Sequence, residues 1–320
     1  MRLAALVLLA GCPFDHGAAT SRDGGGRMLD ANVDAPDGSV ALTCLDRWRA
    51  HSVAFDAGTL IPGVSVVGAA DRDPFLSSDE LTLYFDSDRG VSGSPALQWT
   101  ATRTSLAATF TTPVKLAGAI DGMPEESKLV TTGDGLDAIL SSDRGITTFE
   151  LWEATRTQTT MAFAAPNQTH LAMVNQAMMN NFDPWMSPDG LHLYFSPAIP
   201  AGHQAIDLAT RGSLAASFGA PVELTELDTA FGEGDPALTS DELVILFTSQ
   251  QTGTKGMTDL WYATRAAIDE PFGAPVQLLD LDTVANEGDA QLSPDACRLY
   301  FASDRDETTY DYDLYMATMQ

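Results

Sequence analysis

Acidic side chains recur at two positions, two residues apart, in five related segments of the 320-residue chain. Converging carboxylate oxygens are the ligands that a hard cation such as Ca²⁺ prefers. The first position holds Asp71, Glu125, Asn181, Glu233 and Glu287, and the second holds Asp73, Ser127, Asp183, Asp235 and Asp289. The candidate calcium ligands are Asp73, Asp183, Asp235, Asp289, Glu233 and Glu287. Turn and capping roles for the individual aspartates are the alternative.

These acidic positions belong to a sequence repeat. Its clearest copy reads DPFLSSDELTLYFDSDRG from Asp73 to Gly90, and later copies read DPWMSPDGLHLYFS, DPALTSDELVILFTS and DAQLSPDACRLYFASDR. A divergent copy, SKLVTTGDGLDAILSSDRG, begins at Ser127. A turn aspartate recurs every 52 to 55 residues, at Asp79, Asp134, Asp189, Asp241 and Asp295. Such a period is typical of a fold built from one supersecondary unit per copy.

Each copy contains four short apolar runs separated by turn residues. The third run ends in Ala-Thr-Arg in four copies, and an FxxP segment follows it. The runs are rich in Leu, Val, Tyr, Phe and Trp and have the length of strands rather than helices. They predict an all-β fold, a single five-bladed β-propeller with four-stranded blades. Residues two apart on an inner strand share a face, so some of the acidic residues should meet at one mouth of the central channel.

The fifth copy ends at Gln320 after its third strand. Phe55 lies 24 residues ahead of Asp79, much as Phe218 lies 23 residues ahead of Asp241. Residues 55–61 should therefore supply the missing outer strand, so that an N-terminal strand closes the ring without an exposed edge. A disulfide between Cys44 and Cys297 would fasten this closure by about 4–5 kcal/mol in the loop-entropy model. Two unpaired buried cysteines are the alternative.

The N-terminus has the features of an export signal. Arg2 precedes the apolar stretch Leu3 to Ala10, which is too short to cross a bilayer. Leu9-Ala10-Gly11-Cys12 resembles the bacterial lipobox, which implies cleavage before Cys12 and lipid attachment to it. A plain secretory signal is the alternative. Residues 1–11 are assigned to the signal peptide, 12–42 to a flexible Gly/Asp-rich tether and 43–320 to the propeller.

The charge balance limits the partners of the chain. It has 17 Lys and Arg residues against 44 Asp and Glu residues, a net charge of −27. Repulsion excludes nucleic acid and an anionic membrane surface as partners. The N-terminal lipid is therefore the expected membrane contact, in the outer rather than the inner membrane because Pro13 follows the cysteine. A monomer is expected.

The repeat, summarised as DPxLSPDGxxLYFxSDRG followed by DLYxAT, resembles the WD40-like repeats of TolB-type β-propellers over residues 55–320. The resemblance implies a propeller used for binding. Long connections should gather on one face. The apolar side chains expected on or near that face are Phe149, Phe182, Trp185, Phe231, Tyr310 and Tyr312.

The expected function is therefore a non-catalytic binding or scaffold module for a protein or glycan of the cell envelope. The sequence contains no GxSxG, HExxH or CxxC motif and no phosphate-binding glycine loop, which argues against several enzyme classes. A propeller glycoside hydrolase needs only paired carboxylates and is the alternative.

Overall fold

The computed structural model describes most of the compact unit Cys44–Gln320. The residues described are 41–89, 96–118, 120, 125–144, 148–175, 180–198, 203–251, 253–306 and 311–320. In the N-terminal unit, Met1–Thr43, the backbone of β1 (Ser21–Arg22) pairs antiparallel with that of β2 (Met28–Leu29). The signal peptide, Cys12 and most of the tether lie outside the described residues. Within the described part, no helix is long and apolar enough to cross a bilayer.

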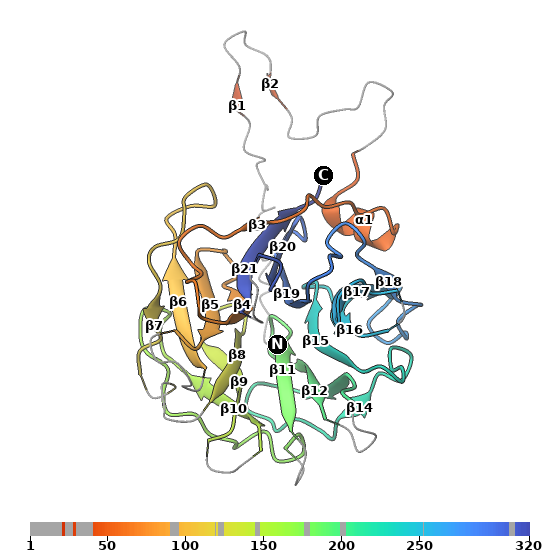
Figure 1. Cartoon of the computed structure of the whole chain (residues 1–320). Helices are drawn as coiled ribbons and strands as arrows, with labels where there is room; N and C mark the ends of the chain where they lie inside the picture. The colour runs from red at the N-terminus through yellow and green to blue at the C-terminus, as the bar shows by residue number, and fades with distance from the viewer. Residues whose placement is uncertain are drawn as a thin grey trace, which may run out of the picture. The chain divides into compact units, whose positions relative to one another are not determined.

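Five antiparallel sheets stand in a ring, which confirms the five-bladed propeller (Figure 1). Blade 1 contains β4 (Asp71–Leu76), β5 (Thr82–Ser87), β6 (Leu97–Thr102) and β7 (Val114–Lys115). Blade 2 contains β8 (Glu126–Thr131), β9 (Asp137–Ser142) and β10 (Glu150–Thr155), with an isolated bridge from Asn167 to Glu153 in the place of the outer strand. Blade 3 contains β11 (Asn181–Met186), β12 (His192–Pro197), β13 (Asp207–Thr210) and β14 (Val222–Glu223).

Blade 4 contains β15 (Glu233–Leu238), β16 (Val244–Ser249), β17 (Asp259–Thr264) and β18 (Val276–Gln277). Blade 5 contains β19 (Glu287–Leu292), β20 (Arg298–Ser303), β21 (Asp313–Thr318) and the N-terminal β3 (Thr59–Leu60). The inner strands are therefore β4, β8, β11, β15 and β19. Their N-terminal ends lie at the face that carries the long connections, and their C-terminal ends lie at the face that carries the short turns.

The ring closes as the sequence predicts. β3 pairs with β21, with Leu60 opposite Tyr315, and Phe55 forms a bridge with Met319. The predicted disulfide is present between Cys44, at the start of α1 (Cys44–Arg49), and Cys297, with a Cα–Cα distance of 5.2 Å. The closure is therefore held by a strand pair, a covalent bond and the packing of α1.

A bulge interrupts every inner strand at its third residue, where the register with the second strand shifts. The bulged residues have positive φ angles and are Asp73, Lys128, Asp183, Asp235 and Asp289. Aspartate tolerates this left-handed conformation better than most residues. Proline follows it in three blades, because the bulge needs no ladder donor there. A bulge also redirects a side chain.

Arginines of the Ala-Thr-Arg segments join neighbouring blades on the short-turn face. In blade 4, the Nε of Arg265 donates to the carbonyl of Glu242 (2.8 Å), and its Nη2 donates to the Tyr194 hydroxyl of blade 3 (2.8 Å). The guanidinium also lies over the ring of Phe272, 4.3 Å from its centre. Arg103 and Arg156 reach Tyr300 and Tyr84 of the preceding blades in the same way. The repeated arginine, tyrosine and phenylalanine therefore act as one joint between blades.

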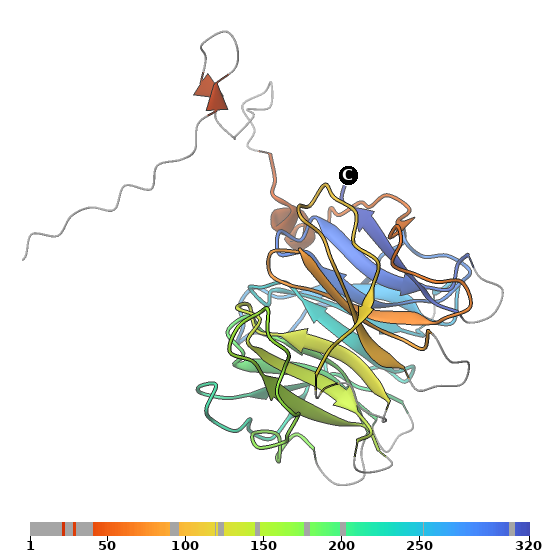
Figure 2. The same cartoon turned by 90° about the vertical axis from the view of Figure 1, so that its left-hand side faces the viewer.

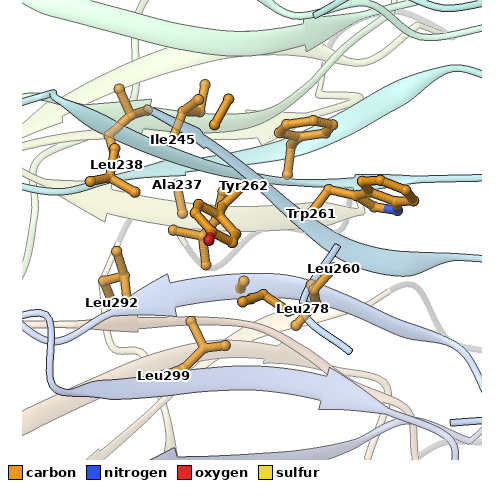
Figure 3. Close-up of a cluster of buried hydrophobic side chains, with 14 of the residues drawn as sticks. Ala237, Leu238, Ile245, Leu260, Trp261, Tyr262, Leu278, Leu292 and Leu299 are labelled. Atoms are coloured by element: carbon orange, nitrogen blue, oxygen red, sulfur yellow. The ribbon is translucent and has the colours of Figure 1, made fainter. Parts of the chain in front are cut away.

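Apolar side chains fill the space between neighbouring sheets. Between blades 4 and 5, Leu238 and Tyr262 belong to the same buried cluster as Leu292 and Leu299 (Figure 3). A side view shows the sheets of neighbouring blades lying against one another (Figure 2). This packing fixes the inner strands around the channel, and so positions the side chains that project from them.

The disulfide should contribute strongly to stability because it spans 253 residues of sequence. Replacing both cysteines, Cys44→Ala with Cys297→Ala, should lower the free energy of unfolding by up to about 4–5 kcal/mol, measured by urea denaturation. Reduced wild-type protein is the matched control and should unfold at the same urea concentration as the double variant. Equal stability of the variant and the oxidised wild type would contradict a closing role for this bond.

Candidate functional site

The two acidic positions correspond to the first and third residues of each inner strand. In blade 2 these residues are Glu126 and Lys128, so the prediction of Glu125 and Ser127 was wrong by one residue. Counting back eight and six residues from each turn aspartate gives the observed register in all five blades. The sequence contains this spacing. Blade 2, however, has Lys128 where the other four blades have aspartate, so its register was assigned one residue too early.

The first-position carboxylates bind their own blades instead of converging in the channel. Asp71 accepts a hydrogen bond from Arg89 (2.6 Å), and Glu287 accepts one from Arg305 (3.2 Å). Glu233 has no such arginine and accepts hydrogen bonds from Thr229 and Ser249. The arginines of the Ser-Asp-Arg segments thus form ion pairs within their own blades. Glu233 and Glu287, which the sequence suggested as calcium ligands, accept these hydrogen bonds within their own blades.

The third-position side chains do come together on the channel axis. The backbone amide of Asp73 in blade 1 donates a hydrogen bond to Oδ2 of Asp289 in blade 5 (3.4 Å). The ammonium of fully buried Lys128 interacts electrostatically with all four third-position aspartates, which are Asp73, Asp183, Asp235 and Asp289. We call these five residues the axial charge cluster. It brings together four of the six predicted calcium ligands, and it contains a cation from the protein itself.

The charges in the axial cluster depend on one another. Burial raises the pKa of Asp183 well above its usual range, and the neighbouring Asp235 carboxylate raises it further. Burial and the charge of Asp73 raise the pKa of Asp289 in the same way. Burial alone would lower the pKa of Lys128, but the four carboxylates outweigh this effect and raise it. The lysine therefore stays charged and offsets part of the negative charge around it.

Lys128 lies among four of the aspartates that the sequence suggested as calcium ligands, but the cluster is buried inside the channel and not at its mouth. Its Nζ has no direct hydrogen-bond partner among the described residues, so its interaction with the aspartates is mainly that of a buried point charge. Arg72 adds a second cation close to Asp289, Asp86 and Asp73, and lies 4.5 Å from the centre of the Tyr312 ring. Calcium as the balancing charge stays a hypothesis from the sequence, and the buried ammonium of Lys128 is the alternative to it.

A separate group of three buried carboxylates has oxygens close enough to surround a cation. Asp259, Asp282 and Glu287 each place an oxygen within 4.8 Å of the others. Lys255 lies 3.3 Å from Asp282, and Arg305 lies 3.2 Å from Glu287, so two protein cations are already present. Burial and the neighbouring acids raise the pKa of Asp259 to about 8. A neutral Asp259 then leaves the charges of Asp282 and Glu287 balanced by Lys255 and Arg305.

The long-loop face contains a groove between blades 3 and 4, which we call the long-loop groove. Its volume is about 410 Å³. Phe182 and Phe231 provide its apolar surface, and Phe231 is 47% exposed. Its polar side chains include His203, Gln204, Gln250 and Thr258. Aromatic surface beside amide and hydroxyl groups suits a ligand that is partly apolar and rich in hydrogen-bonding groups.

The structure places the six predicted binding-face residues in different surroundings. Phe149 lies against Phe182, with ring centres 5.1 Å apart, and Phe231 lines the same groove as Phe182. Trp185 is buried near the opposite end of its strand, where it packs edge-on against Tyr194. Tyr312 packs under Arg72, and Tyr310 lies outside the described residues. Phe149, Phe182 and Phe231 are therefore brought together, whereas Trp185 is not part of this face.

A smaller cavity of about 200 Å³ between blades 2 and 3 is lined by two carboxylates, Asp137 and Glu153. His170 donates its backbone N–H to Glu153 and lies 3.0 Å from it through Nδ1, and Arg211 lines the same cavity. Burial raises the pKa of Asp137. Both carboxylates thus have a basic group close by.

No family model matches the sequence, and no curated protein matches it either. Among solved structures, a thermostable family-43 glycoside hydrolase is similar over 82% of this chain and 92% of its own, with 12% identity and a TM-score of 0.54. The catalytic domain of a GH62 α-L-arabinofuranosidase from Coprinopsis cinerea matches over 84% and 97%, with 11% identity and a TM-score of 0.52. A putative TolB from Agrobacterium tumefaciens matches over 74% and 72%, with 17% identity and a TM-score of 0.46. At these identities the similarity establishes the propeller fold alone.

Replacing the buried cation tests the axial charge cluster. Lys128→Met leaves the aspartates without their central positive charge and should lower the free energy of unfolding by about 3–5 kcal/mol. Millimolar Ca²⁺ should then raise the Tm of this variant but not that of the wild type, as followed by thermal unfolding. Lys115→Met on the exposed strand β7 is the matched control and should change stability by less than about 0.5 kcal/mol. A Ca²⁺-dependent Tm increase in the wild type that Asp289→Asn removes would instead place calcium in the cluster.

Proposed function

We propose that this protein is an exported, lipid-anchored β-propeller that acts as a non-catalytic binding module, holding a glycan of the cell envelope in the long-loop groove. The groove carries this proposal, because an exposed phenylalanine and a second aromatic ring lie beside several uncharged polar side chains. Aromatic rings can pack against the apolar face of a sugar ring, while amide, hydroxyl and imidazole groups hydrogen-bond its hydroxyls. A groove of about 410 Å³ falls within the usual range for small-ligand sites.

Among the described residues, contacts link the two sides of the groove. Gly232 has a φ of +84°, and a Cβ there would lie 3.1 Å from the Cβ of His203. The amide of Glu233 donates to the carbonyl of Gln204 (3.2 Å), which ties the start of β15 to the opposite loop. His203 in turn lies 3.4 Å from Asp228. A preorganised groove loses less entropy on binding than a mobile one.

Export and anchoring have separate support. The Cys44–Cys297 disulfide supports export, because such bonds persist in oxidising compartments. The lipobox-like Leu9-Ala10-Gly11-Cys12 supports lipid attachment at Cys12, in the outer membrane of the envelope. The tether of residues 12–42 would then separate the propeller from the lipid.

A glycoside hydrolase is the second candidate, because Asp137 and Glu153 line one cavity. A glycosidase needs one carboxylic acid and one carboxylate that both reach the scissile bond. Here Glu153 is engaged by His170, and the axial aspartates surround Lys128. These contacts favour binding without catalysis.

Truncating the exposed aromatic of the groove tests the proposed function. Phe231→Ala should weaken binding of soluble envelope oligosaccharides at least tenfold in isothermal titration calorimetry, the effect expected for a central aromatic contact. Val222→Ala is the matched control, since Val222 is 66% exposed on β14 outside the groove, and it should bind as the wild type does. A glycan site in this groove would be contradicted if the wild type, Phe231→Ala and Val222→Ala bound the saccharide equally well. Binding of envelope proteins by the wild type without binding of any saccharide would contradict it too.

A further inference from the structure

A second cavity lies at the opposite end of the inner strands, on the propeller axis. Its volume is about 250 Å³. The last residue of each inner strand contributes to its wall, and these residues are Leu76, Thr131, Met186, Leu238 and Leu292. Phe75 and Trp185 add aromatic surface from two strands. We call this cavity the axial pocket; it is mainly apolar and opens on the short-turn face, away from the long-loop groove.

One polar side chain in the axial pocket lacks a partner. Gln291 lines the pocket from β19 and is 7% exposed. Its Nε2 donates to the carbonyl of Leu292 (3.1 Å), but its Oε1 accepts no hydrogen bond within the described structure. A buried amide oxygen without a donor is unfavourable. A ligand that brings an N–H group into the pocket would satisfy it.

Several hydroxyl groups that line the pocket are already engaged in hydrogen bonds. Ser78 donates to the carbonyl of Gly133 (2.7 Å), which joins two neighbouring turns, and Thr131 donates to the carbonyl of Thr132 (3.0 Å). Ser293 donates to Asp295 within its own turn. Gln291 Oε1 is thus a buried acceptor without a donor, on a residue that lines the pocket.

Negative charge surrounds the pocket opening. In each blade, one residue of the short turn lines the pocket and is followed directly by an aspartate. These aspartates are Asp79, Asp134, Asp189, Asp241 and Asp295. Hydrogen bonds from a hydroxyl and a backbone N–H lower the pKa of Asp79 and Asp134, so both are ionised at neutral pH. In the described structure Asp241 pairs with Arg49 and Asp295 with Arg298, whereas Asp79, Asp134 and Asp189 take part in no ion pair. The opening therefore attracts cations.

We propose that the axial pocket binds a small organic cation, an ammonium group on an apolar body. The ammonium donates a hydrogen bond to Gln291 Oε1 near the acidic opening, and the apolar body packs against Phe75, Trp185 and the ends of the inner strands. This site is independent of the long-loop groove, because it lies at the other end of the inner strands and shares no lining residue with it.

Phenethylammonium is a suitable probe. Phenylacetate, an anion with a similar apolar part, is the comparison ligand. The wild-type protein should bind the cation with a Kd of about 1 mM or tighter, as expected for a ligand of this size, and should bind phenylacetate at least tenfold more weakly, in calorimetry or ligand-observed NMR. Gln291→Leu should weaken binding of the cation about tenfold or more. The double variant Asp79→Asn with Asp189→Asn keeps the side-chain oxygens that accept hydrogen bonds within the two turns. It should weaken binding of the cation severalfold and make the affinity less dependent on salt concentration.

Two further variants keep the test decisive. Ser240→Trp changes an exposed residue at the pocket wall, so folding should be unaffected while the added ring blocks the cavity and abolishes binding. Gln250→Leu, an exposed glutamine of the long-loop groove, is the matched control and should bind phenethylammonium as the wild type does. Equal affinity for the cation and the anion, binding unaffected by both Gln291→Leu and Ser240→Trp, or no binding of the cation at 10 mM would each overturn the proposal.

Discussion

The buried ammonium of Lys128 is the interaction on which the centre of this propeller depends. A ring of repeats brings the same strand position to one axis several times, and here that position is an aspartate in four blades. Four converging carboxylates at low dielectric repel one another unless a positive charge or protons offset them. In blade 2 a lysine occupies the equivalent bulge and provides that charge from within the fold. The divergent repeat is therefore the one that makes the acidic repeats compatible with a closed ring.

The axial charge cluster lies between two surfaces at opposite ends of the inner strands. The long-loop groove lies beside the N-terminal ends of β11 and β15, and the axial pocket lies at the C-terminal ends of all five inner strands. The axial charge cluster lies between these levels of the inner strands. Each end therefore has its own surface chemistry: aromatic and uncharged polar groups in the groove, and an apolar cavity with an acidic opening on the short-turn face. We regard both as binding surfaces on one rigid frame.

The repeat spacing was enough to predict the blades and the closing strand near Phe55, because these follow from register and chain length. The Cys44–Cys297 bond was one of two alternatives, favoured because Cys297 lies in the blade that the N-terminus completes. The site was harder to predict. Trp185 follows Asp183 by two residues, yet a six-residue strand is about 17–20 Å long, so its fifth residue belongs to the other end of the channel. The groove and the orphan oxygen of Gln291 depend on how loops and neighbouring blades approach each other, which no local pattern encodes.

The central claim is that this fold holds its glycan without cleaving it. Mass spectrometry of an envelope oligosaccharide after prolonged incubation with the wild-type protein tests that claim directly. We expect the oligosaccharide to be recovered from the complex at its original length, because the axial carboxylates are held around Lys128 and Glu153 is held by His170. Shortened products that disappear with Glu153→Gln would contradict the claim and identify the propeller as a glycosidase.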